Sequence, residues 1–268
     1  MTSAPYRLAI AIAILQLSYA TFGADTADRA DTDAEPIDDI VVTARRREEN
    51  LQQVPVSITA MSGDQLEARQ LYAMDQLGAV VPNLQFDKAA PSSGSSSVGQ
   101  IFIRGIGQAD FTPVTDPGVA MYVDSIYIGR SPGNVLDLID VERVEVLRGP
   151  QGTQFRRNSL GGAIKVHSRL PSFTDTANRI DLRLGNDDLK AMILRWNLPL
   201  TESLATSIAI GREQRDGYVE RLFDGIRTGN RDRWSARGAV RWEPTDAFAA
   251  SLIVDYSTID ENGAPVVS

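Results

Sequence analysis

The sequence has no cysteine and only one histidine, His167, among its 268 residues. Without cysteine, disulfide frameworks, zinc–thiolate clusters and thiol nucleophiles are excluded. A single histidine cannot form a histidine-rich metal site or a Cys–His pair, and it is more often a structural residue. We therefore expect no metal and no cofactor.

Long apolar runs and an excess of positive charge are missing as well. No apolar run reaches the ~20 residues that a membrane-spanning helix requires. Acidic residues outnumber basic ones, 35 to 27, and the net charge of −8 argues against nucleic acid as a partner. The hydrophobic fraction of 43% is that of an ordinary folded protein of one or two domains.

The first 24 residues have the pattern of an export signal. Arg7 supplies a short positive region, Leu8–Leu17 is an apolar stretch shorter than a membrane span, and Ser18–Ala20 has the small residues of a cleavage site. We expect a signal peptide over residues 1–20, with cleavage after Ala24 as the alternative. A buried N-terminal helix is the competing interpretation.

An acidic stretch of small residues, 21–38, follows and lacks the bulky apolar side chains that form a core. It ends at residues 39–44, which include a β-branched run. An apolar, β-branched strand on a disordered tether is suited to strand addition at the sheet edge of a partner, where backbone hydrogen bonds provide the affinity. The alternative is that these residues form the first strand of the next domain.

Residues 45–170 have the pattern of an α+β domain. Val54–Ala60 predicts a strand, and Ser62 predicts a helix start because Gln65 follows three residues later. A second helix is expected over about residues 73–80, ended by a proline. After a Ser/Gly loop, strands are expected over residues 100–103 and 119–128, the latter with a turn at residues 124–125.

The most specific stretch is Val141–Lys165, VERVEVLRGPQGTQFRRNSLGGAIK. Branched residues separated by charges predict a strand, which stops at Arg148-Gly149-Pro150. Gly152 and the Gly161-Gly162 pair precede a second short strand over residues 163–166. On pattern alone, this stretch is a buried hairpin with glycine-rich turns.

The order of residue types in this stretch closely resembles the signature near the end of the plug domain of TonB-dependent outer-membrane receptors. Four other segments match the plug in the same order: PVSIT, VPNL, IRGIG and YVDSIYIGR. Residues 39–44, DIVVTA, resemble the TonB box, which the energy-transducing protein TonB grips. The resemblance covers about 125 residues, from Ile40 to Ile164.

The resemblance implies three sets of functional residues. TonB would bind Asp39, Ile40, Val41, Val42, Thr43 and Ala44. The plug signature would comprise Arg104, Gly105, Glu142, Glu145, Arg148, Gly149, Pro150, Gly152, Gly161 and Gly162. Outward plug loops would contact ligand at Gln108, Asp110, Phe111, Arg130 and Ser131.

Three positions depart from the family pattern. Gln154 and Arg156 stand where a small apolar residue and a glycine are common, and Ser125 stands where glycine is usual. A residue with a Cβ is penalised at positive φ, which puts the usual turn conformation in doubt at Arg156 and Ser125. The charged residues nearby are interpreted as a structural ion network at the plug–barrel wall and not as catalytic groups: Glu142, Arg143, Glu145 and Arg148.

From Asn178 the pattern changes to segments of about ten residues in which apolar and polar side chains alternate, the dimension of transmembrane β-strands. Five such strands are expected, around residues 180–184, 192–198, 204–210, 234–242 and 248–256, with a longer loop over residues 215–229. Trp234 and Trp242 bound one apolar row, where interfacial aromatic girdles occur. A soluble sheet with one wet face has the same local pattern, but the signal peptide and the plug resemblance favour a barrel.

We therefore predict an α+β plug domain over residues 45–170, followed over residues 171–268 by the start of a transmembrane antiparallel β-barrel. Plugged outer-membrane barrels have ~22 strands, so five are incomplete. An open sheet edge is not tolerated in lipid. The expectation is a fragment of a longer receptor or a truncated gene product.

The resemblance implies a non-enzymatic receptor in the outer membrane of a Gram-negative bacterium, which takes up a scarce nutrient. An iron–siderophore complex is the default ligand, and cobalamin, haem, a sugar or an aromatic compound are alternatives. The implied partners are TonB with its inner-membrane energising complex, a small extracellular ligand and outer-membrane lipid. A truncated plug module that only binds TonB is a further alternative. A secreted hydrolase would need a nucleophile or metal constellation, and none is found.

Overall fold

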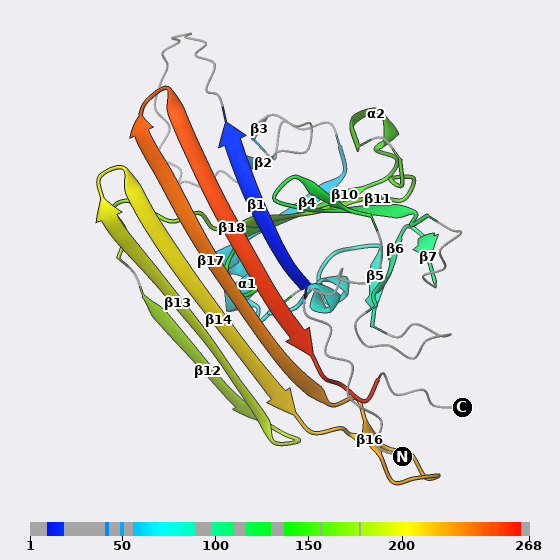
Figure 1. The fold of residues 1–268 in the computed structure, drawn as a ribbon. Coiled ribbons are helices and arrows are strands. Elements are labelled where there is room, and N and C mark those ends of the chain that lie inside the picture. Colours follow the sequence, from blue (N-terminus) through cyan, green and yellow to red (C-terminus); the bar gives the residue numbers. More distant parts are fainter. Residues whose placement is uncertain are drawn as a thin grey trace, which may run out of the picture.

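In a computed structural model, the chain forms a small mixed unit packed against one face of a long antiparallel sheet (Figure 1). The structure describes residues 10–18, 41–42, 49–50, 56–88, 98–109, 116–129, 137–155, 157–176 and 178–263. We call the described part of residues 45–170 the plug region, and the five long strands after it the wall. The predicted fold class, an α+β unit followed by the start of an antiparallel barrel, is confirmed.

The plug region is built on a five-stranded sheet in the order β4-β10-β11-β8-β9. Its strands are β4 (Ile58–Ser62), β8 (Val119–Val123), β9 (Ile126–Ile128), β10 (Val141–Arg148) and β11 (Gly162–Ser168). Strands β8 and β11 are parallel, and the other neighbouring pairs are antiparallel. The predicted signature hairpin is therefore β10–β11, in the middle of the sheet.

Two short helices precede the sheet's central strands. Helix α1 (Gly63–Ala68) begins as predicted: the Ser62 hydroxyl accepts from the Gln65 N–H at 3.2 Å, and the Gln65 side chain accepts from the Ser62 N–H at 3.3 Å. The second helix lies where one was predicted, over Met74–Ala79, and it is a 3-10 helix with backbone bonds that span three residues. A six-residue segment ahead of a proline is short enough for this tighter geometry. Among the described residues, no helix is long and apolar enough to cross a membrane.

A second sheet, β5 (Leu84–Asp87), β6 (Gln100–Ile103) and β7 (Ile106–Gln108), covers one face of the first. Apolar side chains from both sheets and both helices form the main core, which includes Leu66, Met74, Leu77, Ile103, Val144, Val146 and Ile164. A smaller cluster with Tyr122, Leu147 and Phe155 lies on the opposite face of the first sheet, beside α2 (Gly152–Phe155). Both faces of the central strands are therefore covered.

The wall contains the five predicted strands, each antiparallel to its neighbours. They are β12 (Arg179–Gly185), β13 (Leu189–Thr201), β14 (Leu204–Arg215), β17 (Arg231–Thr245) and β18 (Phe248–Ile259). The loop predicted between β14 and β17 contains a short hairpin, β15 (Val219–Glu220) and β16 (Arg227–Thr228).

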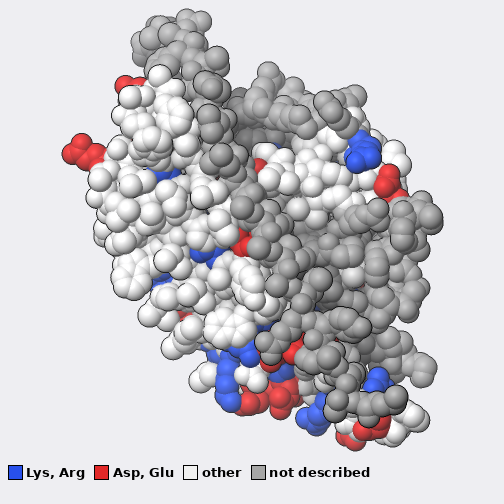
Figure 2. All heavy atoms as spheres, viewed as in Figure 1, with Lys and Arg blue, Asp and Glu red and all other residues white. Residues whose placement is uncertain are grey.

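The outer face of the wall is apolar and exposed, as the alternation predicts. Leu184 is 84% exposed, and Trp234 and Trp242, at the two ends of one row on β17, are 46% and 47% exposed. Further exposed residues of this face are Ile180, Leu182, Trp196, Leu198, Ile208, Leu252, Val254 and Tyr256. Figure 2 shows the face as largely uncharged, with charged residues gathered at its lower end. Such a belt matches the lipid-facing surface of outer-membrane strands.

Strand β1 (Ile10–Ser18) lies antiparallel along β18, from Ile10 opposite Ser257 to Ser18 opposite Ala249. It comprises most of the apolar part of the predicted signal peptide. Its pairing satisfies backbone groups on the edge of β18 that would otherwise be free. The predicted cleavage positions and the tether over residues 21–38 lie outside the described residues, so the signal peptide stays a prediction.

Candidate functional site

Of the six residues predicted to bind a partner by strand addition, the structure describes two, Val41 and Val42. They form β2, which pairs antiparallel with β3 (Glu49–Asn50): Val41 lies opposite Asn50 and Val42 opposite Glu49. Asp39, Ile40, Thr43 and Ala44 lie outside the described residues. The backbone of Val41–Val42 thus has the extended conformation that strand addition uses.

Of the five predicted ligand residues, the structure describes only Gln108. It ends β7, lies opposite Ile101 and is half-buried. Strand β7 follows the tight turn at Arg104-Gly105, where φ is 54° and 79°. Asp110, Phe111, Arg130 and Ser131 lie outside the described residues, so the grouping of these five residues into one site stays a prediction.

The predicted signature glycines stand where the backbone approaches other groups closely. A Cβ on Gly149, whose φ is +111°, would lie 3.2 Å from Nη1 of Arg104. A Cβ on Gly162, whose φ is +149°, would lie 2.1 Å from the Leu147 carbonyl oxygen. Gly161 accepts from the Gly149 N–H at 2.9 Å. Pro150 is exposed and Gly152 begins α2. The signature glycines therefore let the segment between β10 and β11 pack closely against Arg104 and against the backbone of Leu147.

Glu145 is the fully buried centre of an ion network in the plug sheet. Its carboxylate lies 3.0 Å from Nε of Arg143, 3.4 Å from Nζ of Lys165 and 3.3 Å from Nε2 of His167. Arg143 also pairs with Glu142 at 2.6 Å. Because successive side chains of a strand point to opposite faces, Glu145 points away from the core side chains Val144 and Val146.

The position predicted for this network needs a correction. Among the described residues, the ion partners of Glu145 belong to the plug region and not to the wall. Arg148 takes no part in the network, because its guanidinium reaches the Pro82 carbonyl at 3.5 Å. The ion pairs that do join the plug region to the wall involve other residues.

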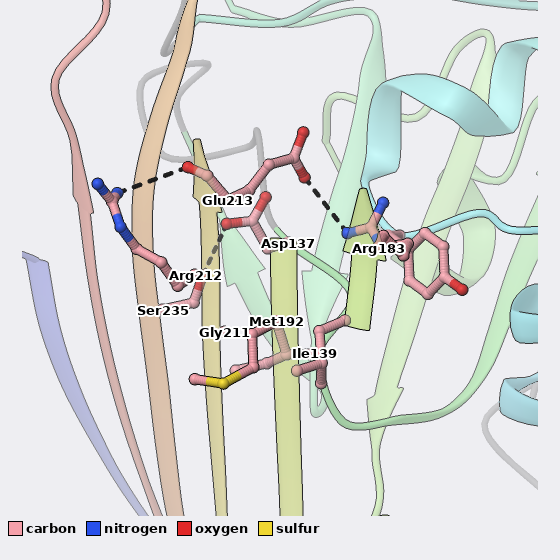
Figure 3. Close-up of a pocket in the computed structure, with 10 residues that line it drawn as sticks. Asp137, Ile139, Arg183, Met192, Gly211, Arg212, Glu213 and Ser235 are labelled. Atoms are coloured by element: carbon pink, nitrogen blue, oxygen red, sulfur yellow. Dashed lines mark hydrogen bonds and ion pairs between the residues drawn. The ribbon is translucent and has the colours of Figure 1, made fainter. Parts of the chain in front are cut away.

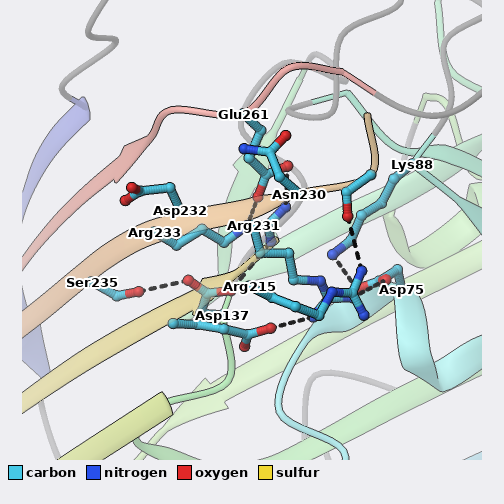
Figure 4. Close-up of polar contacts among 12 residues, drawn as sticks. Asp75, Lys88, Asp137, Arg215, Asn230, Arg231, Asp232, Arg233, Ser235 and Glu261 are labelled. Atoms are coloured by element: carbon cyan, nitrogen blue, oxygen red, sulfur yellow. Dashed lines mark hydrogen bonds and ion pairs between the residues drawn. The ribbon is translucent and has the colours of Figure 1, made fainter. Parts of the chain in front are cut away.

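Four arginines lie on the inner face of β17, and we call them the arginine ladder. Arg231 lies 3.7 Å from the Asp75 carboxylate, Arg233 lies 3.4 Å from the Asp137 carboxylate, Arg237 donates to the Asp140 carbonyl at 3.1 Å, and Arg241 donates to the Pro171 carbonyl at 3.5 Å. They are two or four residues apart, so they share one face of the strand. Figure 4 shows the contacts at the end of the ladder that holds Arg231 and Arg233.

Asp137 connects the plug region to two points of β17. Its carboxylate accepts from the Ser235 hydroxyl at 2.6 Å (Figure 3) and lies beside Arg233, which is only 2% exposed. Arg233 also donates to Glu261, just after β18, with Nη2 and Oε2 3.1 Å apart. One buried guanidinium thus holds the plug region, β17 and the end of β18 together through charge-assisted hydrogen bonds.

Arginines of the neighbouring wall strands make the same kind of contact. Glu67 of α1 pairs with Arg179 of β12 and with Arg195 of β13. The guanidinium of Arg183 lies 3.8 Å from the centre of the Tyr72 ring, a cation–π contact. Arg183 is also 3.5 Å from Glu213 (Figure 3). At each of these contacts the wall supplies the cation.

We call the contacts between the plug region and the wall the junction. An apolar contact adds to its ion pairs and hydrogen bonds. Ile139 of the plug region packs with Tyr72 against Ile193 and Ala209 of the wall. A Cβ added at Gly211 would lie only 2.7 Å from Cγ2 of Ile139. A cavity of about 20 Å³ remains beside this contact, room for about one water molecule. The small wall residues therefore let the plug region approach closely.

Two plug groups at the junction have shifted pKa values. Burial, with the charges of Arg233 and Arg231, lowers the pKa of Lys88 to about 8, although the ion pair with Asp75 at 2.9 Å opposes the shift. Burial also raises the pKa of the Asp140 carboxyl, against the opposing charge of Arg237. Both shifts favour the neutral form and reflect removal from water.

The arginine ladder was not predicted as a site. The sequence did contain a signal for it, because apolar and polar side chains alternate along this strand. The alternation places Arg237 and Arg241 on the face opposite the apolar residues that run from Trp234 to Trp242. If that row faces lipid, the arginines face inward and need polar partners. Within the described part of the chain, no group of three or more His, Asp or Glu is arranged to hold a metal. The junction can bind and release a neighbour electrostatically, and it offers no reactive constellation.

Comparison with known proteins agrees with this arrangement. A family model described as "TonB-dependent Receptor Plug Domain" matches residues 50–163. The vitamin B12 transporter BtuB of Vibrio vulnificus (strain YJ016) is 25% identical over 218 residues, which cover 80% of this chain and 34% of that protein. The pesticin receptor of Yersinia pestis is 35% identical over 120 residues, 44% of this chain and 17% of the receptor. The chain spans about a third or less of the length of these relatives.

A solved structure extends the comparison to the fold. The ferric yersiniabactin uptake receptor FyuA from Yersinia pestis matches with a TM-score of 0.61 at 28% sequence identity. The match covers 71% of this chain and 29% of that chain, so it reaches beyond the residues of the family model.

Proposed function

We propose that the chain belongs to the TonB-dependent receptors, non-enzymatic proteins of the Gram-negative outer membrane, and that it serves the energised uptake of a scarce nutrient. It supplies a plug and five strands that match the start of the family's barrel. The observation that carries the proposal is the pairing of a plug fold with a wall that is apolar outside and charged inside.

In this proposal, TonB binds residues 39–44 by adding a strand, and its pull rearranges the plug. The extended backbone of Val41–Val42 supports such binding. The junction supports rearrangement, because ion pairs and hydrogen bonds can be exchanged for water or for new partners more readily than a large apolar interface can. The outward loops with Gln108, Asp110, Phe111, Arg130 and Ser131 make the first ligand contacts.

For the ligand we propose a ferric siderophore complex. FyuA, a receptor for ferric yersiniabactin, supports this class at 28% identity. Cobalamin is the second candidate, because the vitamin B12 transporter of Vibrio vulnificus matches 80% of the chain.

The test measures uptake by cells that carry the receptor with a substitution in residues 39–44. Val42→Pro removes a backbone donor and blocks strand addition, whereas Val42→Ile keeps the strand and is the matched control. We expect Val42→Pro to abolish uptake of ⁵⁵Fe-labelled ferric yersiniabactin at an unchanged amount of receptor in the outer membrane, and Val42→Ile to retain it.

Three outcomes would change the proposal. Uptake that survives Val42→Pro, or that an uncoupler of the proton gradient leaves unchanged, would contradict energised transport. Uptake of ⁵⁷Co-cyanocobalamin in place of the iron complex would assign the cobalamin ligand. TonB binding without uptake of either compound would leave a TonB-binding module.

A further inference from the structure

The chain that leads from the plug sheet to the first wall strand changes its binding partners along the way. Ser168, at the end of β11, donates through its N–H and its hydroxyl to the Asp124 carboxylate, at 2.7 and 2.6 Å. The Arg169 N–H donates to the Asp140 carbonyl at 3.2 Å, and the Arg169 guanidinium lies 3.4 Å from the Asp64 carboxylate. Up to Arg169, these contacts join the chain to the plug region.

The residues that follow Leu170, 171–176 and 178, bind the wall, and we call them the strap. The side-chain oxygen of Asn197 on β13 accepts from the Ser172 N–H at 2.9 Å. The side-chain nitrogen of Asn197 donates to the Ser172 carbonyl, also at 2.9 Å, and to the Asp175 carbonyl. One asparagine side chain thus satisfies three backbone groups of the strap.

A second wall strand holds the start of the strap. Arg241 of β17 donates to the Pro171 carbonyl at 3.5 Å, and its guanidinium lies 4.6 Å from the centre of the Phe173 ring, a cation–π contact. The Pro171 side chain is fully buried, and its fixed φ makes the first step of the strap stiff. The strap is therefore attached to both β13 and β17.

The arginine ladder shows the same division. Arg241 binds the strap, whereas Arg233 pairs with a plug carboxylate. Arg237 lies between them on β17 and donates to the Ser168 hydroxyl and to the Asp140 carbonyl, both in the plug region. Along β17, the partners thus change from plug to strap between Arg237 and Arg241.

A cavity of about 250 Å³ lies beside this change of partners. Its lining includes Leu170, Glu67 and Asp140 from the plug region and Asn197 from the wall. Leu170 itself is 39% exposed. The space lets the backbone at residues 169–170 change its φ and ψ angles without a collision, as the residues of a hinge do.

We infer that the plug and the wall divide mechanically at Leu170. When the plug moves or unfolds, the strap stays bound to the wall and the chain turns at residues 169–170. Asn197 is the positioning residue that holds the strap in place. The plug thus remains joined to a fixed point on β13 and β17 when its other contacts with the wall break. The inference goes beyond the proposed function, because it applies to any displacement of the plug, with or without uptake.

The test measures hydrogen exchange of single amides in the receptor that carries this chain. The receptor is held in detergent micelles at a urea concentration that unfolds the plug and leaves the wall folded. The probes are the amides of Asp124, which donates to β11 inside the plug sheet, of Arg169, just before the hinge, and of Ser172 on the strap. We expect Asp124 and Arg169 to exchange together and Ser172 to exchange at least about tenfold more slowly, because its bond to Asn197 does not open with the plug.

Substitutions at Asn197 test its role. Asn197→Ala removes all three side-chain bonds, so Ser172 should exchange as fast as Arg169 in urea. Asn197→Asp keeps the acceptor for the Ser172 N–H and loses the donor, so it should give an intermediate rate. Asn186→Ala, in the turn between β12 and β13, is the matched control and should leave the rate of Ser172 unchanged. Asp124 and Arg169 should keep their rates in every variant.

The wild type alone can overturn the inference. Exchange of Ser172 at the rate of Arg169 would show that the strap moves with the plug. Protection of Arg169 at the level of Ser172 would show that the hinge does not lie at Leu170. Unchanged protection of Ser172 in Asn197→Ala would contradict the role of Asn197. Each of these results would leave the proposed uptake standing, because the measurement involves neither ligand nor TonB.

Discussion

The side chain of Ile139 fills the space above Gly211, where an added Cβ would come within 2.7 Å of its γ2 methyl group. Ile139 belongs to the plug and Gly211 to β14, so this contact sets how closely the two parts approach. Two other residues of this β14 face, Ala205 and Ala209, are small and fully buried.

Gly211→Ala should therefore loosen the plug against the wall. Overpacking of a filled site costs about 1–3 kcal/mol, and we expect a lower urea midpoint for plug unfolding and faster proteolysis of the plug. Gly238→Ala is the matched control, because nothing lies within 4 Å of a Cβ at Gly238 on the neighbouring strand. Equal behaviour of the two variants would show that the Ile139 contact does not position the plug.

Asp137→Asn should weaken the junction more than a surface substitution does. It removes one of the two carboxylates that face the buried Arg233, and because Glu261 stays paired with Arg233, the cost is that of a hydrogen bond to a charged group, about 1.5–3 kcal/mol. The readout is protection of plug amides from hydrogen exchange near residues 137–141. Asp224→Asn, which breaks the exposed Arg221–Asp224 pair, is the control and should change nothing there. Unchanged exchange in Asp137→Asn would contradict the role of Asp137.

Ser125→Gly should stabilise the β8–β9 turn. Asp124 and Ser125 both have positive φ, 47° and 71°, the conformation of a tight hairpin turn. A side chain there costs about 1–2 kcal/mol, which glycine avoids. Ser125→Val should act in the opposite direction, because a β-branched residue is penalised further. Thermal unfolding of the two variants measures both effects, and a less stable Ser125→Gly would refute the explanation.

Stability of the plug should rise with pH between about pH 8 and 10 because of Lys88. Its pKa in the folded protein is about 8 and its ordinary value is 10.5. In that window the unfolded chain binds the proton and the folded chain does not, so raising the pH favours folding. The gain is at most about 3 kcal/mol. Urea midpoints of the wild type and Lys88→Met across this range measure it, and identical slopes for both proteins would contradict the prediction.

Helix starts, strands and tight turns were predicted correctly where they depend on residues close together in the sequence. Ser62 with Gln65 predicted the start of α1, and the row from Trp234 to Trp242 predicted both the strand and its exposed face. The turn at Asp124-Ser125 was also located correctly, since it depends on two adjacent residues. Such features are set by spacing along the chain, and spacing is visible in a sequence.

Features that join distant residues could not be predicted in the same way. Arg233 and Asp137 are 96 residues apart, and nothing in either segment identifies the other as its partner. Glu142, Arg143 and Glu145 were recognised as an ion network, but its location was wrong because β-strand alternation alone does not say which neighbour covers a polar face. The 3-10 geometry of Met74–Ala79 was missed because helical periodicity over six residues does not separate the two helix types.

The edge position of β4 has a consequence for the order in which the plug folds. In the plug sheet β4 pairs with β10, where Ser62 lies opposite Arg143, about 80 residues further along the chain. The β10–β11 hairpin closes a much shorter loop, so it loses less entropy and can form first. Strand β4 can only dock after β10 exists, and the chain between them remains unpaired with the sheet until then. The C-terminal part of the plug sheet is therefore expected to form first, and β4 joins it in a later step that closes a longer loop.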